Sequence, residues 1–508
     1  MSTSAPRPEV LAFLQAIKAC PDDDTPRLVL ADWLEENDDS RGGLIRLQCL
    51  HQATSTLDFQ HSRYRQLLEE WTEAHQEEWD QLIPEPIASF TQHHRGLLKL
   101  QSSRLPDVPP DAWKDSEILH WIESWKLRAA THDLSNITAH AWYPHVTEID
   151  IRLASNLNLD QLTAQQPLEK RLDLALLTGQ HWPELDQSRL ADWEGLRDVH
   201  TLRFQEVHDR PLNLILSSPH LQNLRELDFS LNNTTNKDLL TIAKKKCLQP
   251  VESLRIRPSN EVSLQPQTSG LRALFASNHL RSLRRLDLPD VIPSDKEALL
   301  LARSPALSSI ERLDLSRNVP DSRPDRICKQ GARALADSPF VGSLKELYLQ
   351  NHEIGDAGAV ALAQSKTLEQ LTTLNLANNT IHVEGLKALL TADLPSLRYL
   401  NLAGNKIEGY LLFDIESWNA KGQLTTLNLS SMELGDEGVE YLARSAALES
   451  LTTLILNQNW IRGRAANRLL KSRYLEKLRR IQLEGNLIDE LSQEKLRDRH
   501  GDRVEIIF

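Results

Sequence analysis

One leucine pattern recurs at nearly constant spacing through the C-terminal part of this 508-residue chain. The pattern L-x-x-L-x-L-x-x-N, or a close variant, restarts every 26 or 27 residues. The restarts are at Leu344, Leu371, Leu397, Leu424, Leu451 and Leu478. A fixed period of this length is typical of chains that stack one small structural unit many times. The pattern therefore predicts a solenoid, which grows by adding units and does not enclose a single core.

Each repeat predicts one strand followed by one helix. Leu374 and Leu376 are two residues apart, so in an extended chain they share a buried face while Asn375 points away. After each pattern the apolar residues recur at helical spacing, as in residues 385–390 and 438–443. Successive strands must then be parallel and joined by right-handed crossovers. The recurrent Asn is expected to satisfy backbone groups in the turn after each strand.

The two layers need different spacings, and this predicts curvature. Neighbouring strands lie about 4.8 Å apart, whereas packed helices need about 8–10 Å. We therefore expect a horseshoe with the strands on its concave face. Asp356 and Asp436 follow glycines at the start of predicted helices, and we expect each to cap its own helix.

These repeats resemble the leucine-rich repeat, in the long form of ribonuclease-inhibitor-like proteins. Degenerate copies precede them and bring the number to about fourteen. The resemblance implies an α/β fold: a right-handed leucine-rich-repeat solenoid with a parallel concave sheet and a mostly helical convex side, preceded by a small all-α N-terminal domain. His352 and Met432 stand where the turn asparagine is expected. Residues 319–327 form an insertion, and residues 409–422 replace a helix with an irregular segment.

The N-terminal block resembles a second family. Residues 9–52 contain P-D-D-D-x-P-R-L-V-x-A-D-W-L-E-E and, further on, I-R-L-Q, which are similar to the bacterial repeat-companion domain. That family has no established activity, and Gly43-Leu44 departs from its usual pattern. Phe90, Arg95 and Gly96 resemble the strand that joins such a domain to its repeats.

The expected domain organisation follows from these two resemblances. Residues 1–85 form a helical repeat-companion domain with a trailing amphipathic helix. Residues 86–508 form the leucine-rich-repeat domain, with an N-terminal cap near residues 90–100 and a C-terminal capping strand at residues 504–508.

Composition narrows the function. A net charge of -13 disfavours a nucleic-acid or anionic-membrane partner. The four cysteines contain no CxxC pair, which indicates free, buried thiols in a reducing compartment. The sequence has no signal peptide and no apolar run long enough for a membrane span, so a cytoplasmic, monomeric, bacterial protein is expected.

No motif for catalysis, a cofactor or a metal is present. The sequence therefore favours a non-enzymatic scaffold that binds an unidentified protein partner. One alternative is a regulator of an enzyme such as a GTPase, with Arg323 or Arg326 of the insertion as the active residue. Another is an enzymatic companion domain using Asp32 and Arg46.

The alternation of side chains along the strands identifies the residues expected on the concave face. Tyr348 and Tyr399 are expected to be exposed there and to suit a contact site. The alternative is that the charged members neutralise one another as cross-strand pairs. The proposed partner-binding residues are Asp228, Arg255, Asp287, Asp314, Tyr348, Asn375, Tyr399, Asn401 and Asn428.

Overall fold

The computed structural model forms two compact units, residues 1–228 and residues 229–508. The residues it describes are 6–21, 23–53, 59–82, 91–95, 97–102, 117–127, 143–153, 170–177, 184–205, 212–232, 234–258, 268–292, 294–317, 326–418 and 423–508. No helix in these ranges is both long enough and apolar enough to cross a membrane.

The first unit begins with helices, as expected. They are α1 (Pro8–Ala19), α2 (Thr25–Glu36), α3 (Arg41–Ala53) and α4 (Phe59–Leu82). Helix α1 buries Val10, Leu14 and Ile17, which lie on one face at helical spacing. Helix α2 has Pro26 in its first turn, where proline's missing N–H costs no hydrogen bond.

The strands of the first unit follow these helices. β1 (Thr91–His94) and β2 (Leu97–Ser102) form an antiparallel hairpin, and the later strands add in parallel. The later strands are β3 (Ile122–Leu127), β4 (Glu148–Leu153), β5 (Arg171–Leu177), β6 (Val199–Gln205) and β7 (Glu226–Asn232), which runs into the second unit. The intervening helical segments are α5 (Ile118–Trp121), η3 (Tyr143–His145), α7 (Glu184–Asp192), η4 (Glu194–Asp198) and α8 (Leu212–Ile215).

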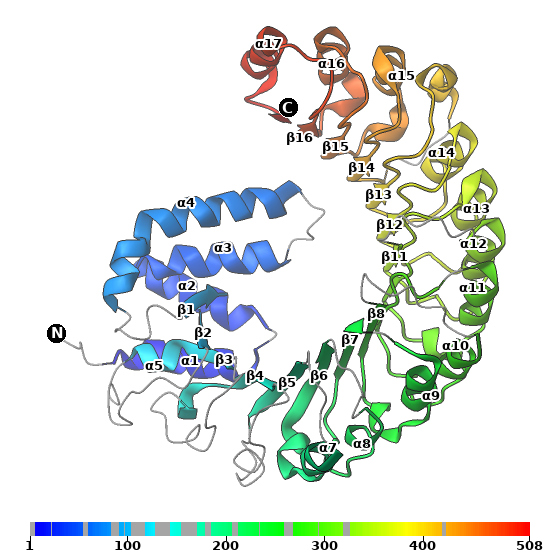
Figure 1. The fold of residues 1–508 in the computed structure, drawn as a ribbon. Coiled ribbons are helices and arrows are strands. Elements are labelled where there is room, and N and C mark those ends of the chain that lie inside the picture. The colour runs from blue at the N-terminus through cyan, green and yellow to red at the C-terminus, as the bar shows by residue number, and fades with distance from the viewer. Residues whose placement is uncertain are drawn as a thin grey trace. The chain divides into compact units, whose positions relative to one another are not determined.

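The second unit consists of strand–helix repeats with the strands on the inside of its arc and the helices outside (Figure 1). Its strands are β8 (Ser253–Pro258), β9 (Arg285–Asp287), β10 (Arg312–Asp314), β11 (Glu346–Tyr348), β12 (Thr373–Asn375), β13 (Tyr399–Asn401), β14 (Thr426–Asn428), β15 (Thr453–Ile455), β16 (Arg480–Gln482) and β17 (Glu505–Ile507). Its α-helices are α9 (Asn236–Lys244), α10 (Thr268–Phe275), α11 (Asp295–Ala302), α12 (Lys329–Ala336), α13 (Gly355–Ala363), α14 (Val383–Leu390), α15 (Gly435–Leu442), α16 (Gly463–Leu470) and α17 (Glu490–His500). Short 3-10 segments are η5 (Lys246–Leu248), η6 (Pro305–Leu307), η7 (Gly409–Leu412), η8 (Ile415–Ser417), η9 (Ala446–Leu448) and η10 (Arg473–Leu475).

The leucine pattern forms the core of this unit. Leu347, Leu374 and Leu400 stand opposite one another on adjacent parallel strands and are buried. Leu376 is also buried, whereas Asn375 between the two core leucines is half-exposed, so the predicted alternation is confirmed. The fold is therefore the expected α/β solenoid.

The turn asparagines do what their position predicts. Asn379 donates from Nδ2 to the Leu349 carbonyl at 2.7 Å, and Asn405 accepts at Oδ1 from the N–H groups of Asn379 and Ile381, both at 2.9 Å. Asn405 also donates to the carbonyl of Leu376 in the preceding repeat at 2.9 Å. Each side chain therefore links the backbone of two neighbouring turns.

His352 takes over this role in its own repeat. Its Nε2 lies 2.8 Å from the Leu315 carbonyl, and its Nδ1 accepts the N–H of Ile327 at 3.3 Å. These contacts require the neutral tautomer with the proton on Nε2. Burial lowers the pKa of His352 to about 4, so the ring is neutral at pH 7.

The expectation that Asp356 and Asp436 cap their own helices is wrong for both residues. The Asp356 carboxylate instead accepts from the N–H groups of His382 at 2.8 Å and Gly385 at 2.9 Å, at the start of the next helix, α14. Asp436 likewise accepts from Arg462 N–H at 2.8 Å, at the start of α16. Because neighbouring helices start side by side, a carboxylate in one first turn reaches the free N–H groups of the next.

The irregular segment is confirmed in its described part, where η7 and η8 replace an α-helix. At Gly409 an added Cβ would lie 1.8 Å from the Leu434 carbonyl oxygen, so only glycine permits this close approach to the next repeat. All four cysteines are free, but Cys20 is exposed and only Cys49 is buried, so the expectation of buried thiols is wrong for the others.

Candidate functional site

The inner strand face of the second unit places most of the expected contact residues in one row. The register aligns each residue with its neighbour on the next parallel strand. The row is Arg255, Asp287, Asp314, Tyr348, Asn375, Asn401 and Asn428. Asp228 lies in the first unit, where it is buried on β7 opposite Arg203 of β6.

The short polar members of the row also hold the ends of their own strands. Asn375 Oδ1 accepts the N–H of Ala377 at 3.1 Å, and Asn401 Oδ1 accepts that of Ala403 at 3.0 Å. Asp314 and Asn428 make the same bond two residues on. This Asx turn uses one side-chain oxygen and needs an Asp or Asn. The amide-rich half of the row therefore has a local structural cause beside any role in binding.

Charged side chains at the start of the row form a dense ion-pair network. Asp287 contacts Arg255 at 3.4 Å, Arg285 at 2.7 Å and Arg312 at 3.3 Å. The alternative of cross-strand neutralisation is thus confirmed for Arg255 and Asp287. The arginines remain partly exposed, while the Asp287 carboxylate beneath them is buried.

Tyr348 extends this network and is half-buried. Its hydroxyl accepts from Arg312 Nη1 and donates to Glu346 Oε2, both at 3.0 Å. The Arg312 guanidinium lies over the Tyr348 ring, 4.4 Å from its centroid. Burial raises the pKa of Tyr348 to about 12, so the phenol stays protonated.

Tyr399 contradicts the expected exposure. Only 8% of its surface is accessible, because it lies between Thr373 and Thr426 on the adjoining strands of an inward-curving face. Burial raises the pKa of Tyr399 to about 12. Tyr399 is therefore part of the packed sheet surface and is unsuited to be a contact anchor.

A second row lies two residues before the first on the same face, and of its members only Tyr399 was predicted from the sequence. In this row Arg285 stands opposite Arg312, and Arg312 opposite Glu346. The same positions hold Thr373, Thr426 and Thr453 in later repeats, all buried. The period of two that identified the first row also applies to these positions.

The residues of the two alternative functions are engaged in ordinary ion pairs. Arg46 pairs with Asp32 and with Glu35 on the exposed surface of α2 and α3. Arg326 contacts the Asn351 carbonyl and Glu353 of the following repeat, both at 3.3 Å. Arg323 lies outside the described residues.

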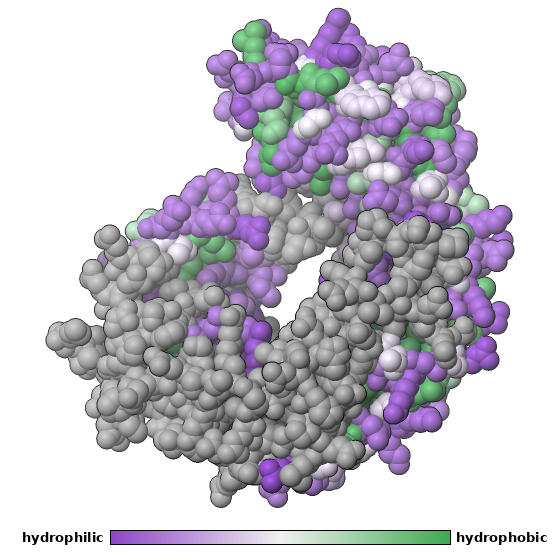
Figure 2. Space-filling model, in the orientation of Figure 1, coloured by the Kyte–Doolittle hydropathy of each residue, from purple (hydrophilic) through white to green (hydrophobic). Residues whose placement is uncertain are grey.

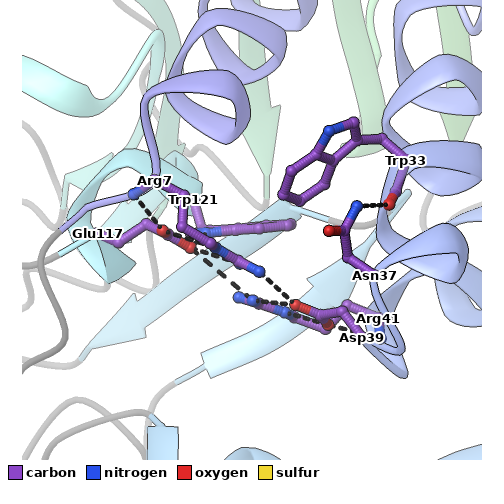
Figure 3. Close-up of polar contacts among 7 residues, drawn as sticks. All are labelled: Arg7, Trp33, Asn37, Asp39, Arg41, Glu117 and Trp121. Carbon is purple, nitrogen blue, oxygen red and sulfur yellow. Dashed lines mark hydrogen bonds and ion pairs between the residues drawn. The ribbon is translucent and has the colours of Figure 1, made fainter.

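A polar cluster links the N-terminal helices to α5 in the first unit (Figure 3). Arg7 contacts Glu117 at 2.8 Å and Asp39 at 3.0 Å, and Arg41 contacts Asp39 at 2.6 Å. The Arg41 guanidinium lies 4.3 Å from the centroid of Trp121. Burial raises the pKa of Asp39, but hydrogen bonds from Arg41 and Arg7 outweigh it and lower the pKa to about 2. Both carboxylates are thus held as anions by arginines, and the cluster joins two segments of the fold.

The other described surfaces have fewer features that suit a functional site. Among the described residues no group of three or more His, Cys, Asp or Glu side chains could hold a metal ion. Figure 2 shows a mostly hydrophilic surface over α15 to α17, with small separate hydrophobic spots. Exposed large hydrophobic residues of the second unit include Tyr410, Phe413, Trp460, Leu487 and Leu491.

Comparison with known proteins identifies the repeats. Models of the leucine-rich repeat match residues 343–363, 369–390, 396–418 and 424–443. The chain therefore contains leucine-rich repeats.

Similar solved structures include two bacterial proteins. An internalin of Listeria monocytogenes is 20% identical, with a TM-score of 0.37, over 76% of this chain and 85% of that chain. A leucine-rich-repeat protein of Leptospira interrogans is 18% identical, with a TM-score of 0.38, over 72% of this chain and 90% of that chain. No curated protein matches the chain.

Proposed function

We propose that this chain is a non-enzymatic scaffold that binds a partner protein on the inner strand face of residues 229–508. One observation carries the proposal: side chains from Arg255 to Asn428 stand in a single register across consecutive parallel strands. A rigid row lowers the ordering cost of association, so modest contacts summed over several strands give useful affinity. Repeat proteins use extended inner faces of this kind for binding.

The proposed surface is narrower than the sequence suggests. It keeps Arg255, Asp314, Tyr348, Asn375, Asn401 and Asn428 as contact residues, and it keeps Asp287 as the buried carboxylate beneath the arginines. It leaves out Tyr399, which is buried in the sheet, and Asp228, which is buried in the first unit. We further propose a cytoplasmic monomer with a repeat-companion domain at residues 1–85, without nucleic-acid or membrane partners.

Site-specific photocrosslinking tests the surface. Asn401→p-benzoylphenylalanine places the probe on the strand face, and Arg333→p-benzoylphenylalanine places it on the exposed side of helix α12. Both variants are made in the full chain, and their melting temperatures are compared with the wild type. We expect one discrete crosslinked partner from position 401 and none from position 333. The reverse pattern would overturn the strand-face proposal.

The enzyme-regulator alternative has weaker support. A residue acting on another enzyme's substrate must project freely, whereas Arg326 is bonded to the following turn. If Arg326→Ala abolished an effect on a partner's GTP hydrolysis while binding persisted, this alternative would replace the scaffold.

A further inference from the structure

The charged start of the inner face contains more arginine than the fold requires. Arg285 and Arg312 stand directly opposite each other on β9 and β10. Like charges at directly opposed positions destabilise a sheet. Threonine occupies the same position on β12, β14 and β15, so the repeat forms without an arginine there.

The exposures of the side chains show which charge faces outward. The Arg255, Arg285 and Arg312 side chains are 32%, 39% and 29% exposed, whereas that of Asp287 is 6% exposed. Each arginine contacts Asp287 through Nε, on the flank of the guanidinium. Among the described residues, the terminal Nη groups of Arg285 have no hydrogen-bond partner. The carboxylate thus lies beneath the arginines and fixes their orientation, while guanidinium groups form the accessible surface.

From this arrangement we propose that Arg255, Arg285 and Arg312 form a receptor for a carboxylate side chain of the partner protein. The proposal rests on the strand-face scaffold function and specifies the chemistry of its ligand. A guanidinium presents parallel N–H donors that match the two oxygens of a carboxylate. Asp287 restricts the arginine side chains before the partner arrives, which reduces the ordering cost on binding.

The local charge selects a single carboxylate over a polyanion. Asp287, Glu346 and Asp314 place three carboxylates beside the three arginines, so the cluster has no large positive excess that would attract a polyanion. The Oδ1 atom of Asp314 accepts the Ser316 N–H. The net charge of the chain, -13, opposes phosphate-rich ligands such as nucleic acid. An acidic peptide segment with one seated carboxylate fits both constraints.

NMR of the full chain labelled with 15N-arginine tests the receptor without the natural partner. The probes are an acetylated and amidated Gly-Glu-Gly-Glu-Gly peptide, its glutamine counterpart and inorganic phosphate. We expect the Glu peptide to cause saturable shifts in the Nε–H signals of Arg255, Arg285 and Arg312. The Gln peptide should cause none, and phosphate should bind more weakly than the Glu peptide.

Two matched arginine variants show whether the Glu peptide binds at the proposed receptor. Arg285→Gln should weaken binding of the Glu peptide by about tenfold, because it removes one fork of donors. Arg333→Gln, an exposed arginine on helix α12, should leave binding unchanged. If Arg285→Gln alters the melting temperature by several degrees, Arg255→Gln supplies the same test.

The outcomes separate this inference from the scaffold function. The carboxylate receptor would be overturned if the signal shifts did not saturate or if all arginines shifted equally. It would also be overturned if phosphate bound more tightly than the Glu peptide. Crosslinking from position 401 would still support the scaffold in those cases. A partner that crosslinks only from position 333 would overturn the scaffold, and with it the role of the receptor in partner binding.

Discussion

Arg27 of α2 donates from Nη2 to Oε1 of Glu123 on β3 at 2.8 Å, and the arginine is fully buried. Its Nη1 also donates to the carbonyls of Pro21 at 2.9 Å and Asp23 at 3.2 Å. Arg95, at the turn between β1 and β2, bonds to the same Pro21 carbonyl and to Asp24. The loop before α2 is therefore fastened to the first strands by two arginines.

Removing one member of the buried pair should destabilise the first unit. Glu123→Ala leaves the Arg27 charge buried without a carboxylate and should cost about 3–5 kcal/mol in urea unfolding. Arg46→Ala removes an exposed pair on the same helices and should cost under about 1 kcal/mol. Equal losses would mean that the Arg27–Glu123 contact contributes no more than a surface pair. By the same reasoning, a fragment beginning at residue 90 should be unstable, since it leaves Glu123 without Arg27.

The stability of the second unit should depend on pH through His352. Its folded pKa is about 4, below the ordinary 6.5, so the unfolded chain binds the proton more tightly. Stability is then complete above pH 6.5 and falls as the pH drops from 6.5 towards 4. The wild type should lose about 2 kcal/mol between pH 7.5 and pH 5.0 through this group. The positive charges of Arg317 and Arg326 oppose protonation of the ring further.

His352→Asn isolates this effect. Asparagine fills the same position at residues 379, 405 and 459, so the variant should fold and remain within about 1 kcal/mol of the wild type at pH 7.5. Its urea midpoint should change less than that of the wild type on acidification. Burial also lowers the pKa of His145 to about 4. Because both proteins contain His145, its contribution to the pH dependence cancels in the comparison. Parallel pH profiles would show that His352 does not titrate as argued.

The capping contact between repeats should be measurable. Asp356→Ala removes the acceptor for two N–H groups at the start of α14 and should cost about 1–2 kcal/mol. Asp356→Asn keeps an oxygen and should cost less. In Asp356→Ala, amide hydrogen exchange should become faster than in the wild type at the start of α14. It should not become faster within α13, which contains Asp356. Faster exchange confined to α13 would restore the original expectation of a cap within one helix.

The inside and outside of a repeat should respond differently to truncation. Leu376→Ala leaves a cavity in the buried leucine layer and should cost about 2–5 kcal/mol. Asn375→Ala loses the bond to the Ala377 N–H and should cost under about 1 kcal/mol. Urea melts of the two variants provide the measurement, and similar costs would contradict the assignment of the two faces.

The last strand should protect the end of the sheet. β17 pairs in parallel with β16, and Arg480 contacts Glu505 at 3.1 Å. Deleting residues 504–508 should uncover Ile481 and Leu483 and lower the melting temperature or cause aggregation. Light scattering and thermal melts test this, and unchanged behaviour would show that β16 already closes the unit.

Periodicity was enough to determine the solenoid, because the positions that must be buried recur with the geometry of a strand and then of a helix. Leu374, Leu376 and the turn asparagines could be placed on the correct side of the chain from spacing alone. The outward row from Arg255 to Asn428 followed from the same alternation. These features depend on local geometry, which a sequence period records directly.

Only the tertiary structure decided which outward residues are accessible and which partners they take. Tyr399 faces outward yet is covered, because the inward-curving sheet brings Thr373 and Thr426 against it. Asp356 caps a helix in the following repeat, and three arginines share Asp287 across three strands. Arg285 and Asp287 are two positions apart, but the other contacts join residues at least 25 positions apart. The stacking of repeats sets the distances between such residues, and a linear pattern does not contain them.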